Sequence, residues 1–187
     1  LRPRLPMSWK SKLAERCWLW GGEHSMPDDS EARTGYQSVF RSALFEDQVV
    51  IVTGGGSGIG RCTAHELASL GARVVLVGRK QEKLDQVLGE LRDSGFEGES
   101  EALDIRDETA VREAVGRVLE RHGRIQGLVN NAGGQFPAPL AAINQKGFET
   151  VVRTNLVGGF LFAREVYTQC MSRHEGAIVN MVAEYVA

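Results

Sequence analysis

Residues 48–60 read QVVIVTGGGSGIG, and this stretch decides the fold class. A short apolar run rich in β-branched residues comes first, which is typical of a strand buried on both faces in a parallel sheet. A glycine-rich turn follows. Apolar residues then repeat at helical spacing as far as Gly71, which predicts a helix whose apolar positions are Ile59, Ala64, Leu67 and Leu70.

The alternation of strand and helix continues through the rest of the chain. Apolar runs predict strands at 48–53, 73–77, 99–103, 125–130 and 177–182. Helices are expected between them, including one from the N-cap candidate Asp107 to Gly123 and a long one at 145–173. Parallel neighbours need crossover connections, and helices supply them. We therefore expect an α/β protein with a doubly wound parallel sheet of the Rossmann type.

Two regions differ in composition. Residues 1–25 hold all three tryptophans and an excess of basic residues, and they fit either upstream read-through before Met26 or an Arg-rich transit peptide. We expect residues 1–45 to be an appended, poorly ordered segment. Residues 46–187 are expected to form the sheet domain, as an incomplete domain truncated after the fifth strand.

Composition narrows the function classes. The 187 residues are 42% hydrophobic and 25% charged with a net charge of -2, which is typical of a soluble globular protein and favours a small-molecule substrate over nucleic acid or a membrane surface. No apolar run is long enough to span a bilayer. The three cysteines form no CxxC pair and the four histidines share no ligand spacing, so no metal site is predicted and a reducing, cytoplasmic location is expected.

The glycine-rich turn predicts a dinucleotide site. Gly54 permits a tight turn, Gly58 lets a diphosphate approach bare backbone, and Gly60 lets helix and strand pack closely. Free amides at the helix start and its positive dipole end then bind phosphate, which adds Ser57 and Ile59 to the candidates. The alternative is an ordinary tight turn. The absence of Gly-Lys-Ser/Thr argues against a P-loop nucleoside triphosphatase.

The end of the second strand favours NADP(H) as the coenzyme. NAD-binding proteins place an acid there for the ribose hydroxyls, but this chain reads Val77-Gly78-Arg79-Lys80. Arg79 and Lys80 carry positive charge where a 2′-phosphate would lie. The Arg79 guanidinium can donate two charge-assisted hydrogen bonds to such a phosphate. The alternative is that both cations form a solvated helix start.

Further motifs resemble the short-chain dehydrogenase/reductase family across residues 45–187. They are Leu103-Asp104-Ile105, Asn130-Asn131-Ala132-Gly133, Thr154-Asn155 and the run from Gly176 to Asn180. The resemblance implies the strand order 3-2-1-4-5. It also implies that Asp104 binds the adenine amino group beside Ile105, and that Asn131, Ala132 and Gly133 line the coenzyme. Independently of the family, these residues could form capping or strand-ending turns.

Asn155 is the candidate catalytic residue. It continues an apolar stripe of the long helix made by Phe148, Val151, Val152 and Gly159, so a buried amide in need of partners is expected. In the resemblance, the matching asparagine holds a water that connects the catalytic lysine to solvent. The alternative is a locally satisfied polar side chain.

The chain departs from the family pattern near its end. Ala183 stands where the family usually has a serine, and no Tyr-x-x-x-Lys pair occurs, because Tyr185 lies too close to the fifth strand. We therefore expect the chain by itself to be inactive and the full-length protein to be a homo-oligomer, as family members commonly are.

Three short segments, at 133–136, 142–148 and 179–182, resemble the branch that contains peroxisomal trans-2-enoyl-CoA reductases. The resemblance implies an NADP(H)-dependent reductase of an enoyl-CoA or related acyl thioester. The alternatives are a carbonyl reductase or alcohol dehydrogenase of the same family, which Ala183 disfavours, and a non-catalytic nucleotide-binding module.

Overall fold

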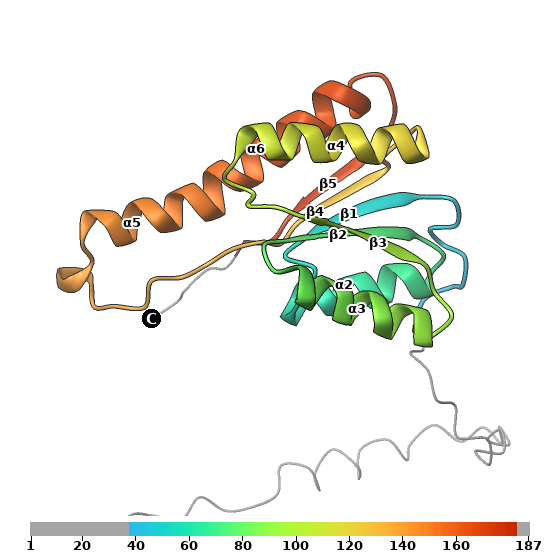
Figure 1. Cartoon of the computed structure of the whole chain (residues 1–187), viewed down its shortest axis with the longest axis horizontal. Coiled ribbons are helices and arrows are strands. Elements are labelled where there is room, and N and C mark those ends of the chain that lie inside the picture. Colours follow the sequence, from blue (N-terminus) through green and yellow to red (C-terminus); the bar gives the residue numbers. More distant parts are fainter. Residues whose placement is uncertain (1–37, 183–187) are drawn as a thin grey trace, which may run out of the picture. The chain divides into compact units, whose positions relative to one another are not determined.

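A parallel five-stranded sheet lies at the centre of the computed structural model, which describes residues 38–182 (Figure 1). The chain divides into Leu1–Thr34 and Gly35–Ala187, and the described residues belong to the second unit. The strands are β1 (Val49–Thr53), β2 (Arg73–Gly78), β3 (Gly98–Ala102), β4 (Gly127–Asn130) and β5 (Ala177–Asn180). Their order is β3-β2-β1-β4-β5, and all neighbours are parallel. The predicted fold class and strand order are confirmed.

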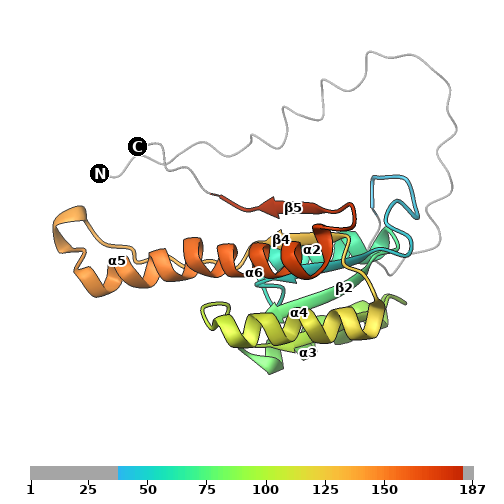
Figure 2. The ribbon, with the colours of Figure 1, turned by 90° about the horizontal axis from the view of Figure 1, so that it is seen from above.

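Helices cover both faces of this sheet. The elements are α2 (Gly58–Ser69), α3 (Gln81–Asp93), α4 (Glu108–His122), η1 (Leu140–Ala142), α5 (Gln145–Val152), η2 (Arg153–Gly158), α6 (Gly159–Val166) and η3 (Tyr167–Met171). Figure 1 shows α2 and α3 on one face and α4 and α6 on the other. Figure 2 shows α5 and α6 following one another in a single long helix. The η2 and η3 segments of that helix are π-helical, which the sequence did not indicate.

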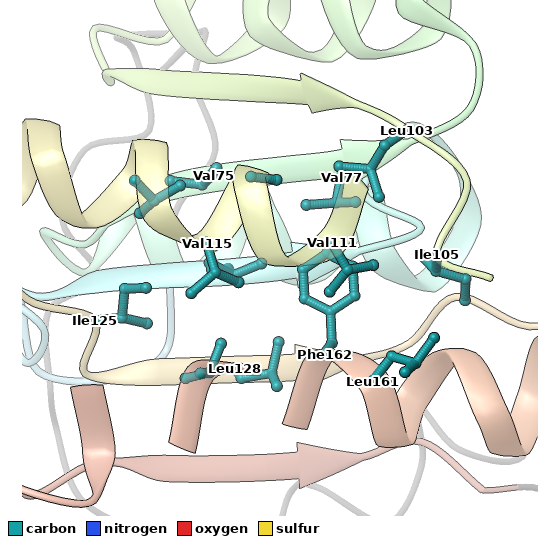
Figure 3. Packing of buried hydrophobic residues seen from close by; sticks show 14 of the residues in the cluster. Val75, Val77, Leu103, Ile105, Val111, Val115, Ile125, Leu128, Leu161 and Phe162 are labelled. Atoms are coloured by element: carbon teal, nitrogen blue, oxygen red, sulfur yellow. The ribbon is translucent and has the colours of Figure 1, made fainter. Parts of the chain in front are cut away.

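An apolar cluster fills each face of the sheet. The cluster under α4 and α6 includes Val75, Val115, Leu128 and Phe162, and Figure 3 shows Phe162 beside Val111. The cluster under α2 and α3 includes Val52, Ala64, Leu76 and Leu84. Because β1 and β2 contribute to both clusters, their side chains are buried on either side. This explains why these two strands are continuous apolar runs in the sequence.

The predicted start and end of α4 behave as expected, whereas one apolar position predicted for α2 does not. The Asp107 carboxylate accepts hydrogen bonds from the amides of Thr109 and Ala110, and Gly123 ends α4 with a φ of 73°. That position is Ile59, which is 62% exposed and does not join the buried face of α2. The buried positions of α2 are Gly60, Ala64 and Ala68, which lie four residues apart, and Ile59 lies off that stripe.

Charged side chains cover the edge strand β3. Glu101 of β3 is buried and accepts hydrogen bonds from Arg117 and Arg121 of α4. Burial alone would raise the pKa of this carboxyl, but the two guanidinium groups outweigh that effect and lower it. Polar cover of this kind keeps an edge strand from pairing with other chains. It also explains why β3 gives a weaker apolar signal than the inner strands.

The described residues, 38–182, contain no helix that is both long enough and apolar enough to cross a membrane. Within the same range, no group of three or more His, Cys, Asp or Glu side chains is arranged to hold a metal ion.

Candidate functional site

The glycine turn between β1 and α2 is tied to the end of the neighbouring strand. The amides of Gly54 and Gly55 both donate to the carbonyl of Val77, at 2.7 and 3.2 Å. Gly54 has a φ of +69° and Gly58 a φ of +54°, values that favour glycine because they are costly for residues with a Cβ. These bonds therefore fix the glycine turn to the end of β2, at the carboxyl edge of the sheet.

Gly60 lies where the helix and the turn approach most closely. A Cβ added at this position would lie 2.3 Å from the carbonyl oxygen of Gly54 and 2.5 Å from the side-chain nitrogen of Asn131. No real side chain fits at such distances, so this contact requires glycine. Gly60 thus brings the first turn of α2 against the ends of β1 and β4.

Gly58 and Ser57 present the opposite situation. A Cβ added at Gly58 would meet no atom within 4 Å, so the space in front of this residue is open in the described part of the chain. Ser57 is the N-cap residue of α2, yet its side chain makes no capping hydrogen bond there. Serine at this position usually accepts such a bond. Its hydroxyl and the unpaired first amides of α2 remain available to a ligand.

Thr53, the last residue of β1, organises the neighbouring strand end. Its buried hydroxyl donates to the carbonyl of Val129 and accepts from the amides of Asn131 and Ala132, both at 3.0 Å. The side-chain nitrogen of Asn131 donates to the Thr53 carbonyl. Sequence reasoning missed this role. The available signal was a hydroxyl at the end of an otherwise apolar strand.

A cavity of about 440 Å³ lies at this edge of the sheet. It brings together nine of the predicted site residues, namely Gly54, Ser57, Arg79, Lys80, Asp104, Ile105, Asn131, Ala132 and Gly133. The predicted residues Gly58, Ile59, Gly60 and Asn155 are not among those that line it. Ala183 and Tyr185 lie outside the described residues.

Among the described residues, one carboxylate and four cations line the cavity. Both oxygens of Asp104 accept hydrogen bonds from the Arg106 guanidinium, and the Arg106 amide donates to one of them. These contacts lower the pKa of the Asp104 carboxyl to about 2, with a smaller effect from the charge of Arg79. Asp104 is therefore ionised at neutral pH, and Arg106 is committed to it.

The other three cations of the cavity are Arg79, Lys80 and Lys83. Among residues 38–182, none of the three forms an ion pair or a side-chain hydrogen bond, whereas most of the other arginines there do so. Unpaired cations around a cavity attract an anionic ligand. The cavity is thus suited to a group with several negative charges.

The structure corrects the expected burial of Asn155. This residue is exposed, and Phe148 of the same expected stripe is 63% exposed. The physical reason is position, because α5 extends beyond the sheet (Figure 1) and this stripe therefore lies away from the core that the described residues form. The Asn155 amide nevertheless makes two hydrogen bonds to Gly134, because it donates to the Gly134 carbonyl at 2.9 Å and accepts from the Gly134 amide at 2.8 Å.

Sequence reasoning also missed several residues that line the cavity. Lys83 lies three residues after Lys80, a spacing that places two side chains on one face of a helix. Arg106 lies two residues after Asp104, but its fork onto that carboxylate requires the turn geometry. Thr150 and Thr154 reach the cavity from the long helix. Only the tertiary structure reveals their proximity.

The family described as short chain dehydrogenase matches residues 48–185. The chain belongs to the short-chain dehydrogenase family. The members of this family are oxidoreductases that use a nicotinamide coenzyme, which agrees with the glycine turn and its cavity.

Known members of the short-chain dehydrogenase family are similar to most of this chain. A peroxisomal 2,4-dienoyl-CoA reductase of Danio rerio is 32% identical over 164 residues, which cover 86% of this chain and 55% of that protein. The structure of a citronellol catabolism dehydrogenase (AtuB) of Pseudomonas aeruginosa PAO1 is 62% identical with a TM-score of 0.77. The match covers 80% of this chain and 61% of that one.

A metagenomic short-chain oxidoreductase in complex with NADP is 39% identical with a TM-score of 0.69. That match covers 74% of this chain and 63% of the other. The chain spans about half the length of the curated relatives that it matches.

Proposed function

We propose that this chain is the coenzyme-binding part of an NADP(H)-dependent oxidoreductase. The observation that carries the proposal is the charge of the cavity. Arg79, Lys80 and Lys83 line it without ion-pair partners in the described part of the chain, and its one acid, Asp104, is already bound to Arg106. A coenzyme with a 2′-phosphate supplies the missing negative charge, whereas the ribose hydroxyls of NAD(H) call for an acid in this place.

The residues of the site fit such a coenzyme. The open space at Gly58 and the first amides of α2 suit the diphosphate, with the uncapped Ser57 hydroxyl as a further donor. Arg79 would form the fork to the 2′-phosphate. Asp104 and Ile105 would hold the adenine, and the segment Asn131 to Gly133 would line the nicotinamide half. When bound, the coenzyme supplies or accepts a hydride.

The proposed substrate is an enoyl-CoA or a related acyl thioester. Hydride would be added to the β-carbon and a proton to the α-carbon of the double bond, so that the carbonyl needs hydrogen-bond donors to stabilise the enolate. The similarity to a 2,4-dienoyl-CoA reductase supports this substrate class. A cytoplasmic location and a homo-oligomeric state of the full-length protein remain predictions.

A specific observation favours a second candidate. The citronellol catabolism dehydrogenase is 62% identical to this chain, which is well above the 32% of the dienoyl-CoA reductase. The second candidate is therefore oxidation of an acyclic terpenoid alcohol with NADP⁺. A non-catalytic nucleotide-binding module is the remaining alternative.

Activity assays with the intact gene product separate these candidates. We expect NADPH oxidation in the presence of a trans-2-enoyl-CoA and none with NADH at the same concentration. NADP⁺ reduction with citronellol, without enoyl-CoA turnover, would favour the second candidate. Tight NADPH binding with neither activity would favour a binding module, and faster turnover with NADH would contradict the coenzyme assignment.

A further inference from the structure

The first turn of α3 carries charges that are unfavourable for a helix start. Lys80 is the N-cap residue and makes no side-chain capping bond, and Lys83 is the third residue of the helix. Cations near the positive end of a helix dipole are destabilising, and Lys80 replaces a residue type that would cap. Glu82 is the one acidic residue in this turn. Such a local conflict indicates that an external anion compensates the charge.

Lys83 is held next to the glycine turn by close backbone packing. A Cβ added at Gly56 would lie 3.1 Å from the Cβ of Lys83 and 3.4 Å from a terminal carbon of Leu84. The turn that faces the coenzyme diphosphate and the first turn of α3 are thus in contact. The Lys83 side chain starts from this contact and lines the same cavity as Arg79.

The remaining charges of the cavity leave Lys83 free to bind an anion. Asp104 is the one acid among the lining residues that the structure describes, and the Arg106 guanidinium donates to both of its oxygens. Within residues 38–182, Lys83 forms no ion pair and no side-chain hydrogen bond. Arg106 is therefore committed to Asp104, and Lys83 belongs with Arg79 and Lys80.

We propose that Lys83 is a specificity-determining residue that binds the 2′-phosphate of NADP(H) together with Arg79. This inference rests on the proposed function and assigns a residue of α3 to the same site. Arg79 supplies the planar fork, and Lys83 supplies a point charge from the adjoining helical turn. Since NAD(H) lacks the 2′-phosphate, Lys83 affects the choice between the two coenzymes and leaves the binding of the shared diphosphate unchanged.

Calorimetric titration of the chain with NADPH and with NADH tests this role. We expect Lys83→Met to weaken NADPH binding about tenfold and to leave NADH binding unchanged. Lys83→Arg keeps the charge and should retain most of the NADPH affinity. Lys146→Met is the matched control, because it removes the same charge from an exposed position on α5 that does not line the cavity.

The outcomes separate this inference from the proposed function. If the unaltered chain prefers NADPH and Lys83→Met binds both coenzymes as the unaltered chain does, the role of Lys83 is wrong and the proposed function stands. An equal loss for NADPH and NADH also overturns the role, because it points to the diphosphate or to the fold. If the unaltered chain shows no preference for NADPH, the proposed function itself fails.

Discussion

The side chain of Asn155 and the backbone of Gly134 exchange two hydrogen bonds, one in each direction, at 2.8 and 2.9 Å. Asn155 lies in the π-helical segment η2, and Gly134 lies in the loop after β4 that lines the cavity. π-Helical turns are rare in proteins, and those that do occur are often found at functional sites. The pair thus fixes the loop beside the coenzyme cavity to the long helix.

Replacing Asn155 tests this connection. In Asn155→Asp a carboxylate oxygen still accepts from the Gly134 amide, whereas Asn155→Leu removes both bonds. We expect slow hydrogen exchange of the Gly134 amide in the unaltered chain and in Asn155→Asp. Exchange should be faster in Asn155→Leu, with a loss of about 1 kcal/mol in the free energy of unfolding. Equal protection in all three proteins would show that the bond pair does not hold the loop.

Two glycines of the chain should respond to alanine in opposite ways. Gly60→Ala places a Cβ against the Gly54 carbonyl, so we expect a loss of about 3 kcal/mol in the free energy of unfolding. Gly89 lies inside α3 with open space around its added Cβ. Gly89→Ala should therefore stabilise the fold by about 0.5–1 kcal/mol. Denaturant unfolding of both variants measures the difference, and a stable Gly60→Ala would disprove the close contact.

Arg79→Asp should reverse the coenzyme preference. The carboxylate would repel the 2′-phosphate of NADPH and would offer an acceptor for the ribose hydroxyls of NADH. We expect NADPH affinity to fall by about a hundredfold and NADH affinity to stay equal or to rise. Fluorescence titration with each coenzyme measures both. A similar loss for both coenzymes would count against the assignment of Arg79.

The Asp104 carboxyl should titrate at unusually low pH. Hydrogen bonds from Arg106 lower its pKa from 3.8 to about 2. Because the pKa is lower in the folded state, the stabilisation by ionised Asp104 is present above about pH 4 and is lost as the pH falls toward 2. Carboxyl carbon NMR should find this low pKa, and Arg106→Met should raise it toward 3.8. An unchanged value in the variant would mean that the fork does not form in solution.

Sequence patterns predicted most of this fold because its inner strands are buried on both faces. Every predicted strand bound lies within two residues of the observed one, and the glycine turn had an unambiguous position after β1. The weaker signal of β3 has a physical cause, since its Glu101 is paired with arginines of α4 rather than packed in the core.

The misses arise where periodicity or spacing stops being informative. The stripe through Asn155 was expected to face the core, but α5 extends beyond the sheet, and both Phe148 and Asn155 are exposed. Thr53 reaches the site through contacts between elements, and no spacing within the sequence encodes those contacts. Lys83 has the right spacing from Lys80, but its place at the cavity depends on the packing of α3 against the glycine turn. Residues grouped by one turn, such as Gly54 and Gly58, were by contrast predictable from local geometry.

The most direct test of the account is calorimetric titration of the folded chain with NADPH, beside the variant Gly58→Val. The account predicts saturable heat with NADPH and weaker binding of NADH. It predicts no binding of either coenzyme by the variant, because the valine side chain fills the open space that the diphosphate would occupy. Circular dichroism establishes that both proteins are folded. Absence of heat with either coenzyme, or unaltered affinity in Gly58→Val, would contradict the account.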